Sequence, residues 1–264
     1  MSHKNSPIGD DGAVIGEWIY SKDIFFENVH FKRTWLTAYQ IGYKAMIINI
    51  SDAIAMNAQP LFALIGAAMP KSMSLYEMDE LARGMRACAS EFGIEIIGGD
   101  TIANCKLDLS ITIISKSKNP LLRKGLKYGD VIAYTGKIGD SLRQLRYLMA
   151  GGKVHINSRF VRPVLRRSFI SKARPFLRCG MDLSDGLYSD IGKLCAANRC
   201  TINWKQKYSK QSACSGEEYE MLIAFSARNA KVLERMSKLT RTPLTVVGTV
   251  CRGKFINRCK AHHF

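Results

Sequence analysis

Segments with helix-like and strand-like spacing of apolar residues alternate along the whole of this 264-residue chain, and no repeat or heptad pattern interrupts them. Residues 107–113 alternate between apolar and polar side chains, which is the pattern of a strand that buries one face. Residues 37–56 and 75–92 instead repeat apolar side chains every three or four positions, which predicts two helices. The chain is therefore expected to fold as a mixed α/β protein.

A break in this periodicity predicts the domain organisation. Lys116-Ser117-Lys118-Asn119-Pro120 is polar and ends in proline, and a new strand is expected directly afterwards at residues 130–135. Because 47% of the residues are hydrophobic, each half has enough apolar material for a core of its own. We predict an N-terminal domain over residues 1–118 and a C-terminal α/β domain over residues 119–264.

The net charge of +17 has three possible causes: binding of nucleic acid, attraction of small anionic phosphates, or a general basic composition of the surface. Basic residues are densest over residues 159–178, but no zinc finger or aromatic-rich RNA-binding strand accompanies them. A nucleic-acid-binding protein without catalysis is therefore the less favoured hypothesis.

The expected compartment is the cytoplasm. The N-terminus has no apolar run that could act as a secretion signal, and no apolar stretch is long enough to cross a membrane. The eight cysteines form no Cys-x-x-Cys pair, so buried free thiols are expected in place of zinc ligands or disulfides.

Acidic residues beside glycine, or at the ends of apolar segments, are the main functional signal. Any one such group could be ordinary turn chemistry or a helix N-cap. Asp52 is the exception, because it interrupts an apolar helical stripe where a carboxylate is costly to bury without a cation or hydrogen-bond donors. Carboxylates gathered from several elements suit Mg²⁺ ions around a polyphosphate. Asp100 is expected directly after a strand at residues 94–97. The six groups are Gly9-Asp10-Asp11, Ser21-Lys22-Asp23, Ser51-Asp52, Gly98-Gly99-Asp100-Thr101, Met181 to Gly186 and Gly216-Glu217-Glu218.

The common phosphate-binding motifs are absent. The segment from Gly248 to Lys254 has the glycine and lysine spacing of a P-loop, but Phe255 occupies the position of the hydroxyl residue. This segment is expected to be a strand and its turn. Any nucleotide would then be held by metal ions, backbone amides and arginines.

The order of the acidic motifs resembles the thiamine-monophosphate kinase family of the aminoimidazole-ribonucleotide-synthetase-like superfamily. The resemblance covers nearly the whole chain. The superfamily shares most of these motifs, whereas Val29-His30-Phe31 and the Gly-Glu-Glu-Tyr-Glu segment favour the kinase. The matching segments are Ile8-Gly9-Asp10-Asp11, Ser21-Lys22-Asp23, Val29-His30-Phe31, Lys44-Ala45 through Ala53, Gly98 to Thr101, Tyr134-Thr135-Gly136, Gly139-Asp140-Ser141, Arg162-Pro163, Met181 to Gly186 and Gly216 to Glu220.

The resemblance implies roles for individual residues. It implies Mg²⁺ ligation by Asp11, Ser21, Lys22 (through its backbone carbonyl), Asp23, Asp52, Asp100, Asp182 and Asp185. It implies contacts with ATP at Gly99, Asp100, Arg123 and Ser184, and with thiamine monophosphate at His30 and Glu217. No catalytic side chain is implied. Residues 259–264 give no clear match for the family's aromatic residue that stacks on thiamine.

The implied reaction is ATP-dependent phosphorylation of thiamine monophosphate to thiamine diphosphate, by direct in-line transfer assisted by several Mg²⁺ ions. The implied architecture is two α/β domains whose N-terminal strands pair across a homodimer, with ATP near the inter-subunit cleft. The nearest alternatives are other ATP-dependent enzymes of the superfamily: aminoimidazole ribonucleotide synthetase, selenophosphate synthetase and the hydrogenase maturation factor. Selenophosphate synthetase ordinarily has a reactive cysteine near its N-terminus, whereas the first cysteine here is Cys88.

Overall fold

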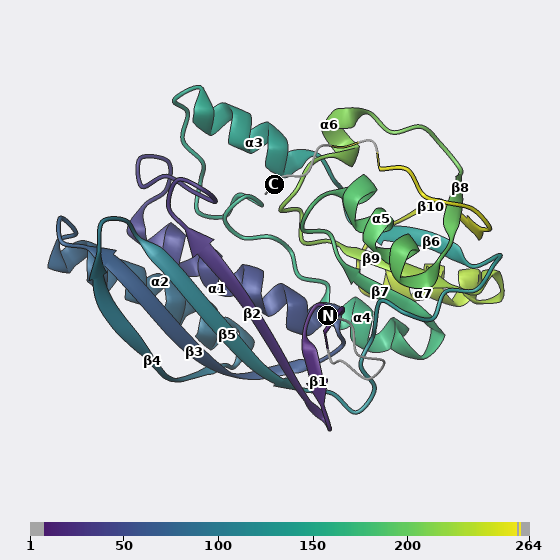
Figure 1. The fold of residues 1–264 in the computed structure, drawn as a ribbon, viewed down its shortest axis with the longest axis horizontal. Helices are drawn as coiled ribbons and strands as arrows, with labels where there is room; N and C mark the ends of the chain where they lie inside the picture. Colours follow the sequence, from purple (N-terminus) through teal and green to yellow (C-terminus); the bar gives the residue numbers. More distant parts are fainter. Residues whose placement is uncertain (1–7, 258, 260–264) are drawn as a thin grey trace.

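Two five-stranded sheets organise the part of the chain that the computed structural model describes, residues 8–257 and 259 (Figure 1). The first sheet has the strand order β1-β2-β5-β3-β4, and the second has the order β7-β9-β6-β10-β8. The mixed α/β class expected from the sequence is confirmed. The domain boundary between residues 118 and 119 stays a prediction.

The first sheet is antiparallel except at one edge, where β3 and β4 run parallel. The helix α2 (Leu75–Phe92) connects these two strands, because parallel neighbours require a crossover. Figure 1 shows α1 (Ala38–Ala55) and α2 on the same face of this sheet. Its strands are β1 (Ala13–Ile15), β2 (Trp18–Phe26), β3 (Gln59–Pro70), β4 (Glu95–Asn104) and β5 (Asp108–Lys116).

The helix α1 is the central element of the molecule, and it is buried on nearly every side because it packs on the first sheet, on α2 and on the second half of the chain. It begins with a capping box in which Thr37 accepts a hydrogen bond from the Gln40 amide and the Gln40 side chain accepts one from the Thr37 amide. Two glycines allow α1 and α2 to touch. A Cβ at Gly42 would lie 2.1 Å from the Leu81 carbonyl oxygen, and one at Gly84 would lie 2.1 Å from that of Tyr39. A side chain at either position would therefore push the helices apart.

The second sheet is covered on both faces. Ile132 and Leu222 pack with α5 (Leu187–Asn198), whereas their neighbours Ala133 and Ile223 pack with α4 (Arg167–Ala173) and α7 (Ala230–Leu239). The strands are β6 (Val131–Thr135), β7 (Cys179–Asp182), β8 (Thr201–Trp204), β9 (Met221–Phe225) and β10 (Leu244–Cys251). The remaining helical segments are α3 (Asp140–Met149), α6 (Lys210–Ala213), η1 (Arg174–Phe176) and η2 (Ala227–Asn229).

The two helices expected in the first half and the strand and turn at Gly248 to Lys254 are confirmed. One expectation about β4 is wrong. The apolar run at residues 94–97 predicted that Asp100 directly follows a strand, but β4 continues to Asn104, so Asp100 lies inside it. The pattern misleads because β4 is an exposed edge strand, where polar side chains and glycines are tolerated.

The cysteines depart from expectation at one pair. Cys214 and Cys259 form a disulfide, with their Cα atoms 5.6 Å apart. The other six are free, as expected, and Cys105 is the exposed one among them. The sequence did not predict the pair because 45 positions separate its members and only the fold brings them together. Among the helices formed by the described residues, none is long and apolar enough to span a membrane.

Candidate active site

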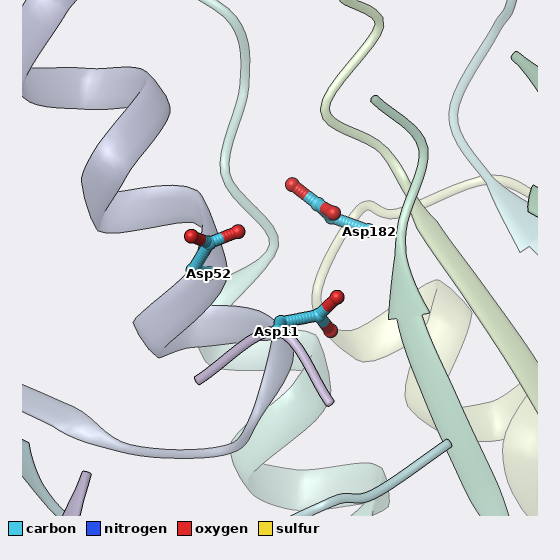
Figure 2. Close-up of side chains that lie close together, drawn as sticks. All are labelled: Asp11, Asp52 and Asp182. Atoms are coloured by element: carbon cyan, nitrogen blue, oxygen red, sulfur yellow. The ribbon is translucent and has the colours of Figure 1, made fainter. Parts of the chain in front are cut away.

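Three carboxylates from distant parts of the sequence meet between the two halves of the molecule. Asp11 precedes β1, Asp52 lies near the end of α1, and Asp182 is the last residue of β7. Each offers an oxygen within 4.8 Å of the others, and Figure 2 shows the three side chains gathered around one space. Asp52, expected on a buried stripe, is half-buried and faces this space, while Ile48 one turn earlier lines the same pocket.

Two carboxylates of the cluster, Asp11 and Asp182, are held by neighbouring side chains. Arg123 donates to Asp11 through Nη2 and through Nε, the latter at 3.1 Å from Oδ1. The Ser51 hydroxyl donates to Asp182 Oδ2 at 2.6 Å. The Asp23 backbone amide donates to Asn49 Oδ1 at 2.8 Å, and this bond ties β2 to α1. The cluster is thus positioned by side chains from both halves of the chain.

A pocket of about 1000 Å³ surrounds the cluster and has two kinds of wall. The acidic wall also contains Arg123 and Ser184, which could bind phosphate oxygens. The apolar wall could hold the flat ring of a small molecule. The acidic side chains are Asp10, Asp11, Asp23, Asp52, Asp182, Asp185 and Glu217, and the apolar wall is formed by Phe26, Val29, Trp35, Ile48, Leu142, Leu145, Met149 and Phe160.

The carboxylates resist ionisation in the absence of cations. Burial, followed by the charge of Asp182, raises the pKa of Asp11 to about 8, although Arg123 opposes the shift. Burial and the charges of Asp182 and Asp185 raise the pKa of Asp23 to about 6. The pKa of Asp52 also rises, first through burial and then through Asp23, Asp182 and Asp11. Burial likewise raises the pKa of Asp182, while the Ser51 hydrogen bond lowers it.

These shifts have a common physical cause, because several buried carboxylates without a cation repel one another. A divalent cation among them would reverse the shifts. The donor atoms are carboxylate oxygens from a compact set of side chains, and such hard ligands fit Mg²⁺.

Most residues singled out from the sequence line this pocket, although their individual roles stay predictions. Lys22 is one of them, and its ammonium donates to Ser110 Oγ at 2.6 Å. His30 Nδ1 accepts a hydrogen bond from the Phe26 amide at 3.0 Å. Lys193 forms an ion pair with Asp185 at 2.6 Å. The pocket brings together Asp11, Lys22, Asp23, His30, Asp52, Arg123, Asp182, Ser184, Asp185 and Glu217.

Three of the singled-out residues lie elsewhere. Ser21 is buried in β2 behind the pocket wall, where its hydroxyl is 3.5 Å from the Asn49 carbonyl oxygen. Gly99 and Asp100 lie on β4, at the opposite edge of the first sheet from β1 and β2. A Cβ at Gly99 would lie 1.8 Å from the Ile65 carbonyl oxygen, so glycine is required there for strand packing. One copy of the chain does not bring Gly99 and Asp100 to the acidic cluster.

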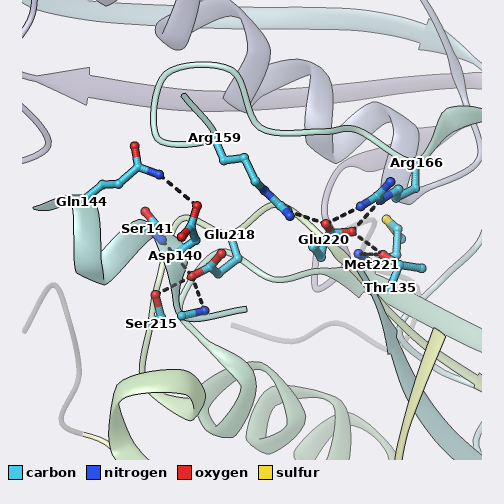
Figure 3. A network of polar contacts seen from close by, with 11 residues as sticks. Thr135, Asp140, Ser141, Gln144, Arg159, Arg166, Ser215, Glu218, Glu220 and Met221 are labelled. Carbon is cyan, nitrogen blue, oxygen red and sulfur yellow. Dashed lines mark hydrogen bonds and ion pairs between the residues drawn. The ribbon is translucent and has the colours of Figure 1, made fainter. Parts of the chain in front are cut away.

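The loop from Ser215 to Glu220 forms part of the pocket wall, and its acidic side chains anchor it (Figure 3). Glu218 accepts hydrogen bonds from the Gly139 amide at 2.7 Å and the Ser141 amide at 3.1 Å. The carboxylate of Glu220 is fully buried and is bound by Arg159, Arg166 and Thr135. These contacts fix the backbone on both sides of Glu217.

Sequence reasoning placed Lys44 in a matching segment but gave it no role; it is a cation in the middle of α1 whose side chain is 0% exposed. Its Nζ lies 2.6 Å from Glu217 Oε2 and 3.5 Å from the centroid of the Phe160 ring. The signal was present, because Lys44 interrupts an apolar helix just as Asp52 does. A buried charge needs a partner in either case.

Comparisons with known proteins show which sequences this chain resembles. Residues 9–116 match the family described as AIR synthase related protein, N-terminal domain. The chain is 29% identical over 272 residues to the thiamine-monophosphate kinase of Buchnera aphidicola subsp. Schizaphis graminum, covering 92% of this chain and 84% of that protein. It is also 29% identical over 278 residues to the Bacillus subtilis thiamine-monophosphate kinase, with the same two coverages. This chain is a relative of the thiamine-monophosphate kinases. The resemblance expected from the motifs is confirmed.

Solved structures share the fold. The structure of AaThiL complexed with AMPPCP and TMP has a TM-score of 0.84 at 24% identity, covering 94% of this chain and 86% of that one. A HypE–HypF complex matches with a TM-score of 0.77 at 16% identity, covering 92% and 88%. At these identities the likeness concerns the fold alone. In sequence, this chain is more similar to the thiamine-monophosphate kinases, at 29% identity, than to the hydrogenase maturation protein, at 16%.

Proposed function

We propose that this chain transfers the γ-phosphoryl group of ATP to thiamine monophosphate, giving ADP and thiamine diphosphate. The observation that carries the proposal is the convergence of Asp11, Asp52 and Asp182 in a pocket with one acidic and one apolar wall. A polyphosphate with its cations suits the acidic wall, and an aromatic ring system suits the apolar wall. The names of the sequence relatives support the same substrates.

The proposed chemistry requires no catalytic side chain. A phosphate monoester is an anionic nucleophile near neutral pH, so one of its oxygens attacks the γ-phosphorus while the bond to the ADP oxygen breaks. Several Mg²⁺ ions, when bound, would neutralise the two anionic reactants. The protein's part is to hold both phosphates in line and to exclude water.

Within this proposal, Asp11, Asp23, Asp52, Asp182 and Asp185 hold the cations, Arg123 and Ser184 bind ATP, and His30 and Glu217 bind thiamine monophosphate. The pocket location of all nine residues supports these roles. Ser21 and Lys22 would take part through the β2 segment that carries Asp23. A cytoplasmic location remains part of the proposal.

A homodimer is also proposed, through the face of the first sheet that α1 and α2 leave uncovered. Tyr20 and Ile24 on β2 and Leu64 on β3 are exposed, whereas their neighbours Ile19, Phe25 and Ala63 lie in the core beneath. An apolar sheet face of this kind is typical of an interface. A dimer would give Gly99 and Asp100, on the exposed edge strand, a route to an ATP site near the subunit boundary. Sedimentation of wild-type protein and of Leu64→Asp, a position that does not line the pocket, tests this; a wild-type monomer contradicts it.

The decisive experiment is to incubate the purified chain with ATP, Mg²⁺ and thiamine monophosphate and to quantify thiamine diphosphate and ADP. Equal amounts of the two products are expected, and chelation of Mg²⁺ should stop their formation. ATP hydrolysis without thiamine diphosphate, or no turnover at all, would overturn the proposal.

A further inference from the structure

The buried ion pair between Lys44 and Glu217 joins the central helix to the loop that walls the pocket. The Lys44 ammonium is fully enclosed, while the Glu217 side chain remains 27% exposed and lines the pocket. One oxygen of Glu217, Oε2, binds Lys44 at 2.6 Å. A buried cation thus binds one oxygen of the Glu217 carboxylate, while the same side chain lines the pocket.

Lys44 also contacts the apolar wall. Its Nζ lies 3.5 Å from the centroid of the Phe160 ring, which is a close cation–π contact, and Phe160 lines the same pocket. The same ammonium therefore touches one acidic and one aromatic member of the pocket wall. Its own place is fixed by α1, which also carries Ile48 and Asp52 into the pocket.

The loop backbone does not need Lys44 to keep its position, because Glu218 and Glu220 already anchor it on both sides of Glu217. What remains for Lys44 to fix is the side chain of Glu217. An unpaired glutamate at a pocket rim samples several rotamers, and ordering it on binding costs affinity. A pre-formed charge-assisted hydrogen bond removes much of that cost.

We propose that Lys44 is a positioning residue for the second substrate: it fixes the Glu217 carboxylate, beside the Phe160 ring, so that this carboxylate meets the heterocyclic part of thiamine monophosphate. This inference rests on the proposed function and adds a residue to it. A carboxylate held in this way accepts hydrogen bonds from an amino group or faces a cationic ring, and thiamine monophosphate carries both. Lys44 does not touch the reacting phosphates, so its effect should fall on binding of that substrate.

The test is a double-mutant cycle with Lys44→Met, Glu217→Gln and the double variant, with Lys238→Met as a control that removes an ion pair on α7, a helix that does not line the pocket. Steady-state kinetics gives the KM for each substrate, and calorimetry gives the Kd for thiamine monophosphate. We expect Lys44→Met to raise the KM and Kd for thiamine monophosphate roughly tenfold, the factor for loss of one well-placed hydrogen bond, with the KM for ATP nearly unchanged. The double variant should match Glu217→Gln, because Lys44 acts through Glu217.

A purely structural role for Lys44 predicts a different result, in which melting temperature falls and both KM values stay at the wild-type level. That result, or additive effects in the double variant, would overturn the inference. If Lys44→Met fails to fold, the comparison of Glu217→Gln with the double variant still tests the inference. Equal Kd values for thiamine monophosphate in these two variants support it. Weaker binding of thiamine monophosphate by the double variant overturns it. Wild-type protein that binds thiamine monophosphate but forms no thiamine diphosphate would sink the proposed function alone.

Discussion

The hydroxyl of Ser51 donates a hydrogen bond of 2.6 Å to Asp182, and this contact joins α1 in the first half of the chain to β7 in the second. Both residues are buried. The bond lowers the pKa of Asp182 against the upward pull of burial, so it favours the ionised form that a metal ion requires.

Ser51→Ala should therefore weaken the metal site without removing a ligand. We expect the Mg²⁺ concentration for half-maximal activity to rise about tenfold, as is usual when a partner of a ligand is lost. Titration of activity with Mg²⁺ at saturating ATP measures it. Ser90→Ala, an exposed serine on α2, is the control. An unchanged Mg²⁺ requirement would contradict the role of the bond.

Asp52→Asn should abolish turnover while the protein stays folded. The carboxylate faces the cluster with Asp11 and Asp182, and the neutral amide is a poor ligand for a divalent cation. Activity at saturating Mg²⁺ and thermal unfolding of the same sample give the two readouts. Asp79→Asn, an exposed aspartate on α2, should keep wild-type activity. Near-normal activity of Asp52→Asn would exclude Asp52 as an essential ligand.

Arg123 and His30 should separate the two substrates. Arg123→Ala is expected chiefly to raise the KM for ATP, since Arg123 binds Asp11 and lines the acidic wall. His30→Ala is expected chiefly to raise the KM for thiamine monophosphate. Kinetics with each substrate varied in turn measures both effects. The reverse pattern would mean that the two subsites are exchanged.

The stability of the metal-free protein should fall as pH rises from 5 to 8. The folded-state pKa values of Asp11 and Asp23 are raised to about 8 and about 6, above their unfolded values. Their contribution to stability is therefore fully present below the unfolded pKa and is lost as pH rises through the folded pKa. Thermal unfolding in a chelator across this range measures the slope, and added Mg²⁺ should flatten it. A melting temperature that rises with pH in the chelator would be inconsistent with a repulsive carboxylate cluster.

The disulfide between Cys214 and Cys259 should contribute measurably to stability. It closes a loop whose ends are 45 positions apart, for which chain entropy gives about 4 kcal/mol. Cys214→Ser should lower the melting temperature, and reductant should have the same effect on wild-type protein but none on the variant. Cys105→Ser, which replaces an exposed free cysteine, is the matched control. Alkylation of all eight cysteines without reductant would show that the bond does not form in solution.

Much of the fold could be predicted from the sequence because most apolar positions of α1, α2 and β5 are positions that the fold buries. The site was readable in part. Asp52 could be singled out because its charge breaks an apolar stripe, whereas Asp11 and Asp182 have no such local signal and were recognised through the order of motifs. The role of Lys44 was not predicted because its partner Glu217 is 173 positions away, a separation that only the fold closes. The disulfide was missed for the same reason.

The close approach of α1 and α2 at Gly42 and Gly84 limits how this chain can vary. Each glycine sits against a carbonyl oxygen of the other helix, so a methyl group added on one side has no space unless the whole interface opens. The steric clash of a larger residue on one helix cannot be removed by a smaller residue on the other helix, since both positions already carry the smallest side chain. Any sequence change there therefore has to move α1 as a body, and with it Lys44, Ile48 and Asp52. A library of substitutions at positions 42 and 84 would consequently lose metal binding and folding together, although neither glycine lines the pocket.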